Sequence, residues 1–289
     1  EMTSSLVGSE MCIRDSGCAC DPVAECMMNR SAFFLTGGTE TPASLCQKLT
    51  DAGMGEAHGV VGENLGTEAE AIRYGSAAEL AGQSFAPLSV LLVENFDLPQ
   101  LRAPGFPDES FIRSEVPMTK QEVRAAALAK LAVMPTDTLW DVGAGTGSVS
   151  VELALAAPKG RVYAVECEPD ACELIRKNRA KFQTYNLILI EGRAPDALAD
   201  LPAPDAVFIG GTKGGMEAVL DEVLGKNPNA RICISAIALE TLGAAIAALT
   251  ARGLTAEVTQ IAVSRTKPAG RLHLLMANNP IFLITGTRK

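Results

Sequence analysis

The sequence predicts an α/β protein in two parts, a C-terminal domain with a mostly parallel sheet and an antiparallel edge strand, preceded by a smaller α/β lobe. From residue 119 onward, short apolar strands alternate with longer helical segments, which is typical of a parallel sheet covered on both faces. The last two strands are joined without a helix, which indicates an antiparallel edge. Three prolines between residues 99 and 107 mark a linker between the parts.

The composition is that of a folded, acidic protein. Its 289 residues are 47% hydrophobic, its net charge is −9, and its length suggests about two domains. No apolar run approaches the roughly 18 residues of a membrane span, and no secretory signal opens the chain, so we expect a cytoplasmic protein with no membrane partner. The acidic balance argues against a nucleic-acid partner. The eight cysteines lack the paired spacing of zinc sites, so we expect no metal.

Residues 1–30 are expected to stand apart from the rest of the chain. Residues 4–16 have neither helical nor strand periodicity and resemble a translated sequencing adapter. An ordinary disordered tail is the alternative. No function is assigned to this stretch, and it is left out of the fold prediction.

The N-terminal lobe is predicted over residues 31–98, and residues 99–112 are predicted to form the linker. Pro42 in the first turn favours a helix that begins after Thr41. The predicted elements are strand 32–35, helix 42–52, strand 58–61, a short helix near 76–82 and strand 88–93.

The C-terminal domain is predicted over residues 113–289. Thr119 and Glu122 have the spacing of a capping box, which predicts a helix that ends near Val133. The strands expected after it are 138–142, 161–165, 187–190, 206–209, 232–235, 257–263 and 281–285. The further helices expected are 148–156, 169–182, 216–224 and 239–251.

The motif that indicates chemistry follows the first strand of this domain. Asp141 precedes a glycine-rich loop, Gly143, Ala144, Gly145, Thr146 and Gly147, which leads into a helix. Glycines allow a sharp turn close to a ligand, and a helix N-terminus offers N–H groups to an anion. Glu166 ends the next strand, where a carboxylate can accept hydrogen bonds from a ribose diol. A structural glycine turn without a ligand is the alternative.

Two classes of cofactor use such a loop. A nicotinamide dinucleotide favours G-x-G-x-x-G, which would require glycine where this chain has Ser148. The pattern D-x-G-x-G-x-G instead resembles the first motif of class I S-adenosylmethionine (SAM) methyltransferases, which have a Rossmann-like fold. In that family the glycine loop faces the methionine end of SAM and the acid, here Glu166, holds the ribose. The residues after the third strand, here Arg193 and the Ala194 backbone, contact adenine.

A closer resemblance extends over residues 109–287. The segments 117–124, 140–150, 208–211, 264–268 and 279–280 are similar to the C-terminal domain of precorrin-6Y C(5,15)-methyltransferases (decarboxylating) of cobalamin biosynthesis. This resemblance implies SAM as cofactor and a precorrin, a tetrapyrrole, as substrate. It implies methylation of carbon 15, loss of carbon dioxide from an acetate side chain, and association into homo-oligomers. Thr119 is a SAM contact in that family, and we expect Gly210 and Gly211 to line the pocket.

The N-terminal lobe resembles the second lobe of a tetrapyrrole methylase domain. Its segments 35–38, 41–43, 62–66 and 87–90 carry this resemblance, and the first lobe is absent from the sequence. The resemblance implies that carbon 5 methylation belongs to this truncated domain. Two alternatives stay open for the whole chain, a SAM-dependent methyltransferase of another substrate such as tRNA and a non-catalytic SAM-binding module.

Basic residues on the predicted loop between the last two strands, and at the start of the first helix of the domain, are candidates for holding the carboxylates of a tetrapyrrole, because guanidinium and ammonium groups pair with carboxylates. Solvated surface charge is the alternative for each. The residues 210–215 after the fourth strand of the domain are either a substrate-facing loop or a simple glycine turn. Glu152 and Glu173 are expected to be exposed helix acids. His273 could protonate the macrocycle, but we expect it to be a packed histidine. The candidates are Lys120, Arg265, Lys267, Arg271 and His273.

Overall fold

The computed structural model describes the whole chain except residues 1–10, 15–20, 96–97, 100–102 and 289. The chain divides into an N-terminal unit, residues 1–100 with 182–186, and a C-terminal unit, residues 101–181 with 187–289. In the described ranges, no helix is long and apolar enough to cross a membrane.

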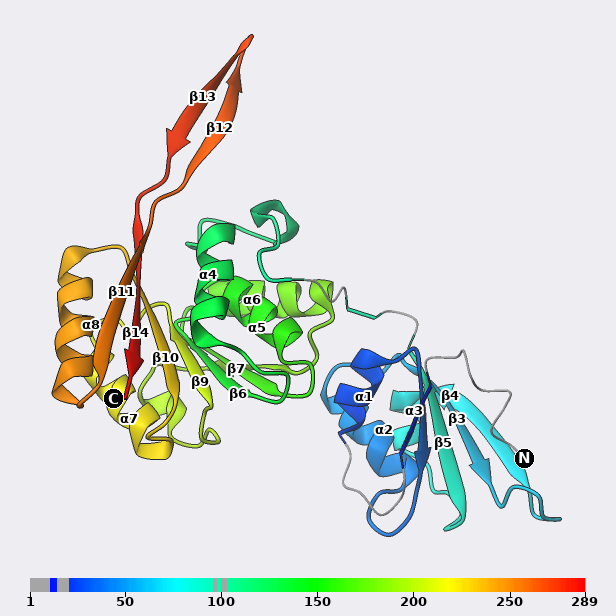
Figure 1. Cartoon of the computed structure of the whole chain (residues 1–289). Helices are drawn as coiled ribbons and strands as arrows, with labels where there is room; N and C mark the ends of the chain where they lie inside the picture. Colours follow the sequence, from blue (N-terminus) through cyan, green and yellow to red (C-terminus); the bar gives the residue numbers. More distant parts are fainter. Residues whose placement is uncertain (1–10, 15–20, 96–97, 100–102, 289) are drawn as a thin grey trace. The chain divides into compact units, whose positions relative to one another are not determined.

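The N-terminal unit contains a sheet in the order β1-β2-β5-β3-β4 together with helices α1 to α3 (Figure 1). Strands β2, β5, β3 and β4 are antiparallel to their neighbours, and β1 is parallel to β2. The strands are β1 (Met11–Arg14), β2 (Ser31–Leu35), β3 (His58–Glu63), β4 (Ala71–Ser76) and β5 (Ser89–Glu94), and the helices are α1 (Pro22–Met28), α2 (Pro42–Asp51) and α3 (Ala77–Ala81).

Three elements of this unit differ from the sequence prediction. Strand β1 pairs with β2 although it lies in residues 4–16, where the sequence shows no strand periodicity. Helix α1 lies in the stretch expected to be a disordered tail, and its apolar face is buried in the core of the unit through Cys26 and Met27. Much of the remaining tail, residues 1–10 and 15–20, lies outside the described residues. Strand β4 is also unpredicted, because its mostly exposed side chains show no alternation of apolar and polar residues.

The C-terminal unit is built on a seven-stranded sheet in the order β11-β14-β10-β9-β6-β7-β8. The predicted mostly parallel sheet is confirmed, since β8, β7, β6, β9 and β10 are all parallel. These strands are β6 (Thr138–Val142), β7 (Arg161–Glu166), β8 (Leu187–Glu191), β9 (Ala206–Ile209) and β10 (Arg231–Ala236), followed by β11 (Thr255–Ile261) and β14 (Ile281–Thr287).

The position of the antiparallel strand differs from the prediction. Strand β14 is antiparallel to β10 on one side and to β11 on the other, so it lies one place in from the edge. The edge strand β11 therefore runs in the same direction as the parallel strands. The carboxyl end of β11 therefore lies on the same side as the carboxyl ends of the parallel strands, which is the side where open α/β folds bind ligands.

Helices cover both faces of this sheet. Alternate strand residues point to opposite faces. Trp140 and Val207 pack with Val219 of α7 and Leu249 of α8, whereas Asp141, on the other face, contacts α5 through Ser150. The helices are α4 (Gln121–Leu131), α5 (Ser148–Ala156), α6 (Pro169–Phe182), α7 (Met216–Lys226) and α8 (Leu239–Ala251), with a short 3-10 helix at Asp108–Ser110.

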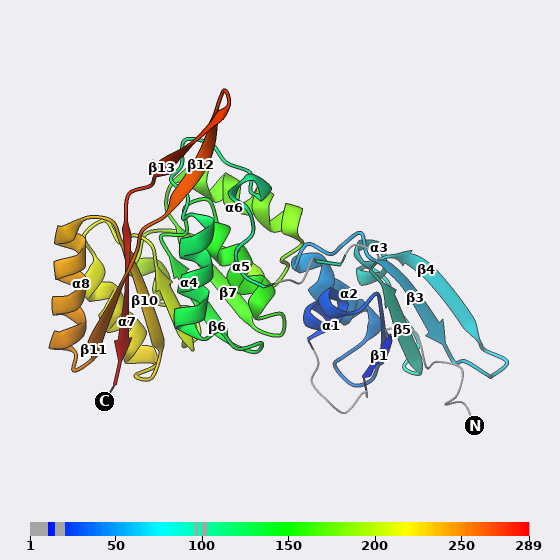
Figure 2. The ribbon, with the colours of Figure 1, turned by 45° about the horizontal axis from the view of Figure 1, so that its top comes forward.

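The segment between β11 and β14 is not the loop that the sequence predicts. It forms an antiparallel hairpin of β12 (Ser264–Ala269) and β13 (Leu272–Ala277), which pair with each other and with no strand of the large sheet. Figures 1 and 2 show this hairpin projecting away from the sheet. Its sequence mixes apolar and basic residues without regular alternation, which explains why strand periodicity was not evident.

A buried arginine ties the start of the C-terminal unit to its first two helices. The Arg124 side chain is fully buried, and its guanidinium donates to Glu152 at 2.7 Å and to Asp108 at 2.9 Å. It also donates to the carbonyl oxygens of Thr119 and Phe106. The guanidinium therefore joins α4, α5 and the residues that precede α4.

Three sequence predictions are wrong at this network. Glu152, expected to be exposed, is 1% exposed and accepts hydrogen bonds from the backbone N–H groups of Gly105 and Phe106. Those residues lie in the predicted linker, whose second half is thus part of the packed unit. The predicted capping box is absent, because α4 begins at Gln121 and the carboxylate of Asp108 accepts the Gln121 N–H at 2.9 Å.

We predict that Arg124→Met destabilises the C-terminal unit by about 3–5 kcal/mol, because it leaves the buried carboxylate of Glu152 without a cation and Asp108 with Arg265 alone. Urea unfolding followed by the fluorescence of Trp140 measures this, since Trp140 is the single tryptophan and lies buried in β6. Arg176→Met, which removes an exposed pair with Glu191, is the control and should cost less than about 1 kcal/mol. Equal losses for both variants would contradict the prediction.

Candidate functional site

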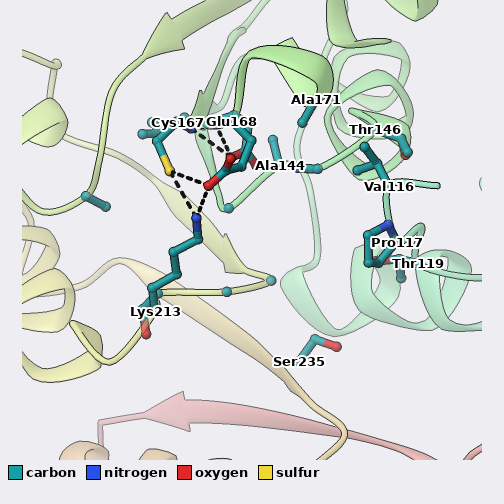
Figure 3. A pocket seen from close by; sticks show the side chains of 18 of the residues that line it. Val116, Pro117, Thr119, Ala144, Thr146, Cys167, Glu168, Ala171, Lys213 and Ser235 are labelled. Atoms are coloured by element: carbon teal, nitrogen blue, oxygen red, sulfur yellow. Dashed lines mark hydrogen bonds and ion pairs between the residues drawn. The ribbon is translucent and has the colours of Figure 1, made fainter. Parts of the chain in front are cut away.

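A pocket of about 510 Å³ opens at the carboxyl ends of the parallel strands (Figure 3). Strands β7 and β8 follow β6 on one side, and β9 and β10 lie on its other side, so the chain order switches between β6 and β9. Open α/β sheets bind ligands at such a switch point. The pocket lies here, between the loops that follow Val142 and Ile209, and its volume is typical of a small-molecule site.

The glycine loop after β6 has the backbone that only glycine adopts without strain. Gly143 has a φ of +74° and Gly145 a φ of +56°. A Cβ atom on Gly143 would lie 2.3 Å from the carbonyl oxygen of Gly211, so the loops after β6 and β9 can meet only because a side chain is absent. Both loops line the pocket through backbone atoms.

Glu166, at the end of β7, lines the pocket and is 8% exposed. One carboxylate oxygen accepts the N–H of Gly145 at 2.8 Å, and the other accepts those of Cys167 at 2.7 Å and Glu168 at 3.0 Å. A carboxylate offers about four lone-pair positions, so about one is left for a ligand hydroxyl. Glu166 thereby holds the glycine loop in place and presents its remaining lone pair to the pocket.

Two polar atoms buried around the loop have no hydrogen-bond partner among the described residues. They are Oδ1 of Asp141 and Oγ1 of Thr146, and Thr146 lines the pocket. The other carboxylate oxygen of Asp141 accepts from the Ser150 hydroxyl. Burial raises the pKa of Asp141 to about 7, and the charge of Glu166 adds to this rise. Unsatisfied buried polar atoms are costly, and because Thr146 lines the pocket, a ligand that donates a hydrogen bond could satisfy its Oγ1.

The remaining walls come from several other segments. Val116 to Thr119 form one wall, held by the Arg124 guanidinium through the Thr119 carbonyl. Arg193 and Ala194 follow β8 and form another. The residues 210–215 after β9 close the pocket opposite Glu168, whose carboxylate forms an ion pair with Lys213.

The structure brings most of the predicted cofactor residues to one pocket. The predicted residues that line it are Thr119, Gly143, Ala144, Gly145, Thr146, Glu166, Arg193, Ala194, Gly210 and Gly211. Asp141 and Gly147 are buried beside the loop but do not line the pocket.

The predicted substrate residues are not gathered in the pocket. Lys120 adjoins its wall, and Lys267 and Arg271 are exposed on or at the turn of the hairpin. His273, expected to be packed, is exposed on β13. Arg265 is engaged within the chain, since it donates to Asp108 at 2.9 Å and to Glu122 at 2.6 Å. It therefore anchors the hairpin to the network around Arg124.

Several lining residues were not predicted as site residues, among them Cys167, Glu168, Lys213 and Ile237. Each follows the carboxyl end of a parallel strand by one to four residues. That position is a usable signal, because the carboxyl ends of parallel strands meet at one edge. Lys213 also lies within a glycine-rich stretch, which marks a loop that approaches other backbone closely.

We predict that Asp141 makes a contribution to the free energy of unfolding that falls as the pH rises from about 4 to 7. The pKa of Asp141 is raised in the folded state, so the folded chain keeps a proton there that the unfolded chain releases. Asp141→Asn should remove this part of the decline, measured by urea unfolding of both proteins across the range. Asp170→Asn, at an exposed position of α6, should leave it in place. An unchanged slope in Asp141→Asn would contradict the assignment.

Comparisons with known proteins identify the family of the C-terminal unit. A family model described as the precorrin methyltransferase domain matches residues 110–288. A probable cobalt-precorrin-6B C(15)-methyltransferase (decarboxylating) of Sulfurisphaera tokodaii is 40% identical over 191 residues, which are 65% of this chain and 100% of the relative. The cobalt-precorrin-6B C(15)-methyltransferase (decarboxylating) of Salmonella typhimurium is 41% identical over 180 residues, 61% of this chain and 93% of the relative.

Solved structures of precorrin-6Y methyltransferases are also similar to this chain. The precorrin-6Y C5,15-methyltransferase of Geobacter metallireducens has a TM-score of 0.63 and 38% identity, and the match covers 66% of this chain and 100% of that one. The C-terminal domain of precorrin-6Y C5,15-methyltransferase from Rhodobacter capsulatus has a TM-score of 0.56 and 36% identity, over 64% and 98% of the two chains. The C-terminal unit has the Rossmann-like fold of class I SAM methyltransferases, and the chain belongs to the precorrin methyltransferase domain family.

Proposed function

We propose that the C-terminal unit is a SAM-dependent C-methyltransferase that methylates carbon 15 of a precorrin and removes carbon dioxide from an acetate side chain. The pocket at the switch point of the sheet carries this proposal. It lies within the segment 110–288 that matches the family, and relatives named for this reaction match over 93–100% of their length. The reaction places the chain in cobalamin biosynthesis.

The residues around the glycine loop fit SAM. Bound SAM would supply a methyl group on a positively charged sulfonium. The partnerless Oγ1 of Thr146, which lines the pocket, can accept a hydrogen bond from a cationic ligand, and Glu166 can accept one from a ribose hydroxyl. Thr119, the glycine loop, Gly210 and Gly211 would enclose the methionine end, and Arg193 and Ala194 the adenine.

Methyl transfer to a carbon nucleophile depends mainly on alignment, so the task of this chain is to hold an electron-rich macrocycle in line with the methyl group. The ring system itself can take up electrons released with carbon dioxide. Lys120 beside the pocket wall, and Lys267, Arg271 and His273 on the hairpin, stay candidates for its carboxylates. The sequence has no Asp or Glu after Glu257, which favours an anionic partner at the hairpin.

The N-terminal unit is proposed to be the second lobe of a tetrapyrrole methylase domain, in which carbon 5 methylation would reside. The sequence resemblance over residues 31–98 supports this proposal. The fused order of the two parts is the order expected for an enzyme that acts on both carbon 5 and carbon 15. The pocket described above lies in the family domain, to which we assign the carbon 15 reaction.

Mass spectrometry of precorrin-6B incubated with methyl-labelled SAM and the full chain tests the function. We expect the gain of one labelled methyl group with the loss of carbon dioxide. Two labelled methyl groups would show that the N-terminal unit also acts. SAM binding without any change in the precorrin would refute the proposal and favour a non-catalytic SAM-binding module. Methylation of tRNA in a parallel incubation would favour the nucleic-acid alternative.

We also propose that the chain forms homo-oligomers through the hairpin. Leu272 is 66% exposed and Leu275 is 71% exposed, and a two-stranded hairpin is marginally stable alone. Light scattering of the purified chain should give a multiple of 30.2 kDa, and the double variant Leu272→Ser/Leu275→Ser should give a smaller multiple. Leu239→Ser, at an exposed leucine of α8, should leave the mass unchanged. A monomeric wild-type chain would rule the proposal out.

A further inference from the structure

The loop of residues 210–215 carries one charged side chain, Lys213, across the mouth of the pocket. Lys213 is a non-glycine residue with a φ of +48°, in a loop with glycines on either side. Its ammonium nitrogen forms an ion pair with Glu168 and lies 3.6 Å from the sulfur of Cys167 (Figure 3). The Lys213 carbonyl accepts from the Arg193 guanidinium at 3.3 Å. The backbone is thus held so that the side chain spans the opening.

Lys213 is suited to bind an anion in this pocket. Among the described residues that line it, Arg193 and Lys213 have positive side chains, and the Arg193 guanidinium is engaged with the Lys213 backbone. The Glu166 carboxylate accepts hydrogen bonds from three backbone N–H groups, and the ion pair of Lys213 is formed with Glu168 instead. An anionic group that enters the mouth of the pocket therefore meets the Lys213 ammonium, with Glu168 as its present partner.

The ion pair between Lys213 and Glu168 is replaceable. The two side chains are 54% and 59% exposed, and exposed pairs contribute little to stability. Glu168 directly precedes α6, where the helix N-terminus favours a negative charge, so this carboxylate can release Lys213 and stay ionised. Replacement of the Glu168 carboxylate by a ligand carboxylate at Lys213 should therefore cost little free energy.

We propose that Lys213 binds a carboxylate of the tetrapyrrole substrate, and that Glu168 occupies Lys213 until the substrate displaces it. Glu168 then competes with the substrate carboxylate for Lys213. Lys213 therefore raises the affinity for the substrate, whereas Glu168 lowers it. The inference rests on the proposed function for the identity of the substrate. It assigns Lys213 to substrate binding and Glu168 to control of access.

Direct binding of a carboxylated tetrapyrrole tests this inference without turnover. The probe is uroporphyrin I, a porphyrin with eight carboxylates, titrated into the full chain in the presence of saturating S-adenosylhomocysteine. Lys213→Met should raise the Kd by about tenfold, the effect of losing one charge-assisted contact. Glu168→Gln should lower the Kd by about two- to fivefold, because an exposed competing pair is removed.

The double variant makes the test specific. If Glu168 acts only through Lys213, Lys213→Met/Glu168→Gln should bind the porphyrin as weakly as Lys213→Met alone. The exposed pair of Lys177 and Glu173 on α6 gives the matched control, and Lys177→Met and Glu173→Gln should leave the Kd unchanged. The Kd of S-adenosylhomocysteine should stay within about twofold in all variants, which is the spread of independent sites.

Three results would overturn the inference. They are a raised or unchanged porphyrin Kd in Glu168→Gln, an unchanged Kd in Lys213→Met, and a loss of S-adenosylhomocysteine affinity in Lys213→Met equal to the loss for the porphyrin. The last would assign Lys213 to the cofactor instead. Because these are binding constants, they stay informative even if the incubation with precorrin-6B shows no methyl transfer, so the two proposals can fail separately.

Discussion

The site depends on the buried ion network around Arg124. A guanidinium with no exposure is stable inside a protein only when carboxylates and carbonyls satisfy it, and here Asp108, Glu152 and the carbonyl of Thr119 do so. The same contacts hold the residues before α4 against α5 and fix the pocket wall that ends at Thr119. Arg265 connects the hairpin to this network through Asp108. One buried charge thus links a pocket wall, two helices and the hairpin.

Much of the C-terminal fold could be predicted because the central strands of its sheet are buried. Apolar runs such as Ala206–Ile209 are short and bounded by turns, and the order of strands and helices specifies a parallel sheet. The prediction failed where the chain pairs outside that pattern. The hairpin of β12 and β13 has exposed apolar residues, and β14 enters between β10 and β11. Strand order in a sheet depends on long-range packing that local periodicity does not contain.

In the candidate site, too, local features could be predicted from the sequence and long-range contacts could not. The glycine loop and Glu166 could be predicted, because a backbone that requires glycine and an acid at a strand end are local features. The burial of Glu152 could not be predicted, since its partner Arg124 lies 28 residues away and nothing in the helix pattern pairs them. Lys213 was also missed as a site residue. A lysine in a glycine-rich turn has no local feature that shows which carboxylate it faces.

The place of β14 in the sheet has a consequence for how the chain folds. The five parallel strands are complete once β10 is made, but β10 and the edge strand β11 are joined only by β14, the last strand of the unit. During synthesis, the backbone groups of β10 on that side must wait for residues 281–287 to leave the ribosome. Until then the nascent sheet has an open, apolar edge, which is the kind of surface that chaperones protect and that aggregation exploits.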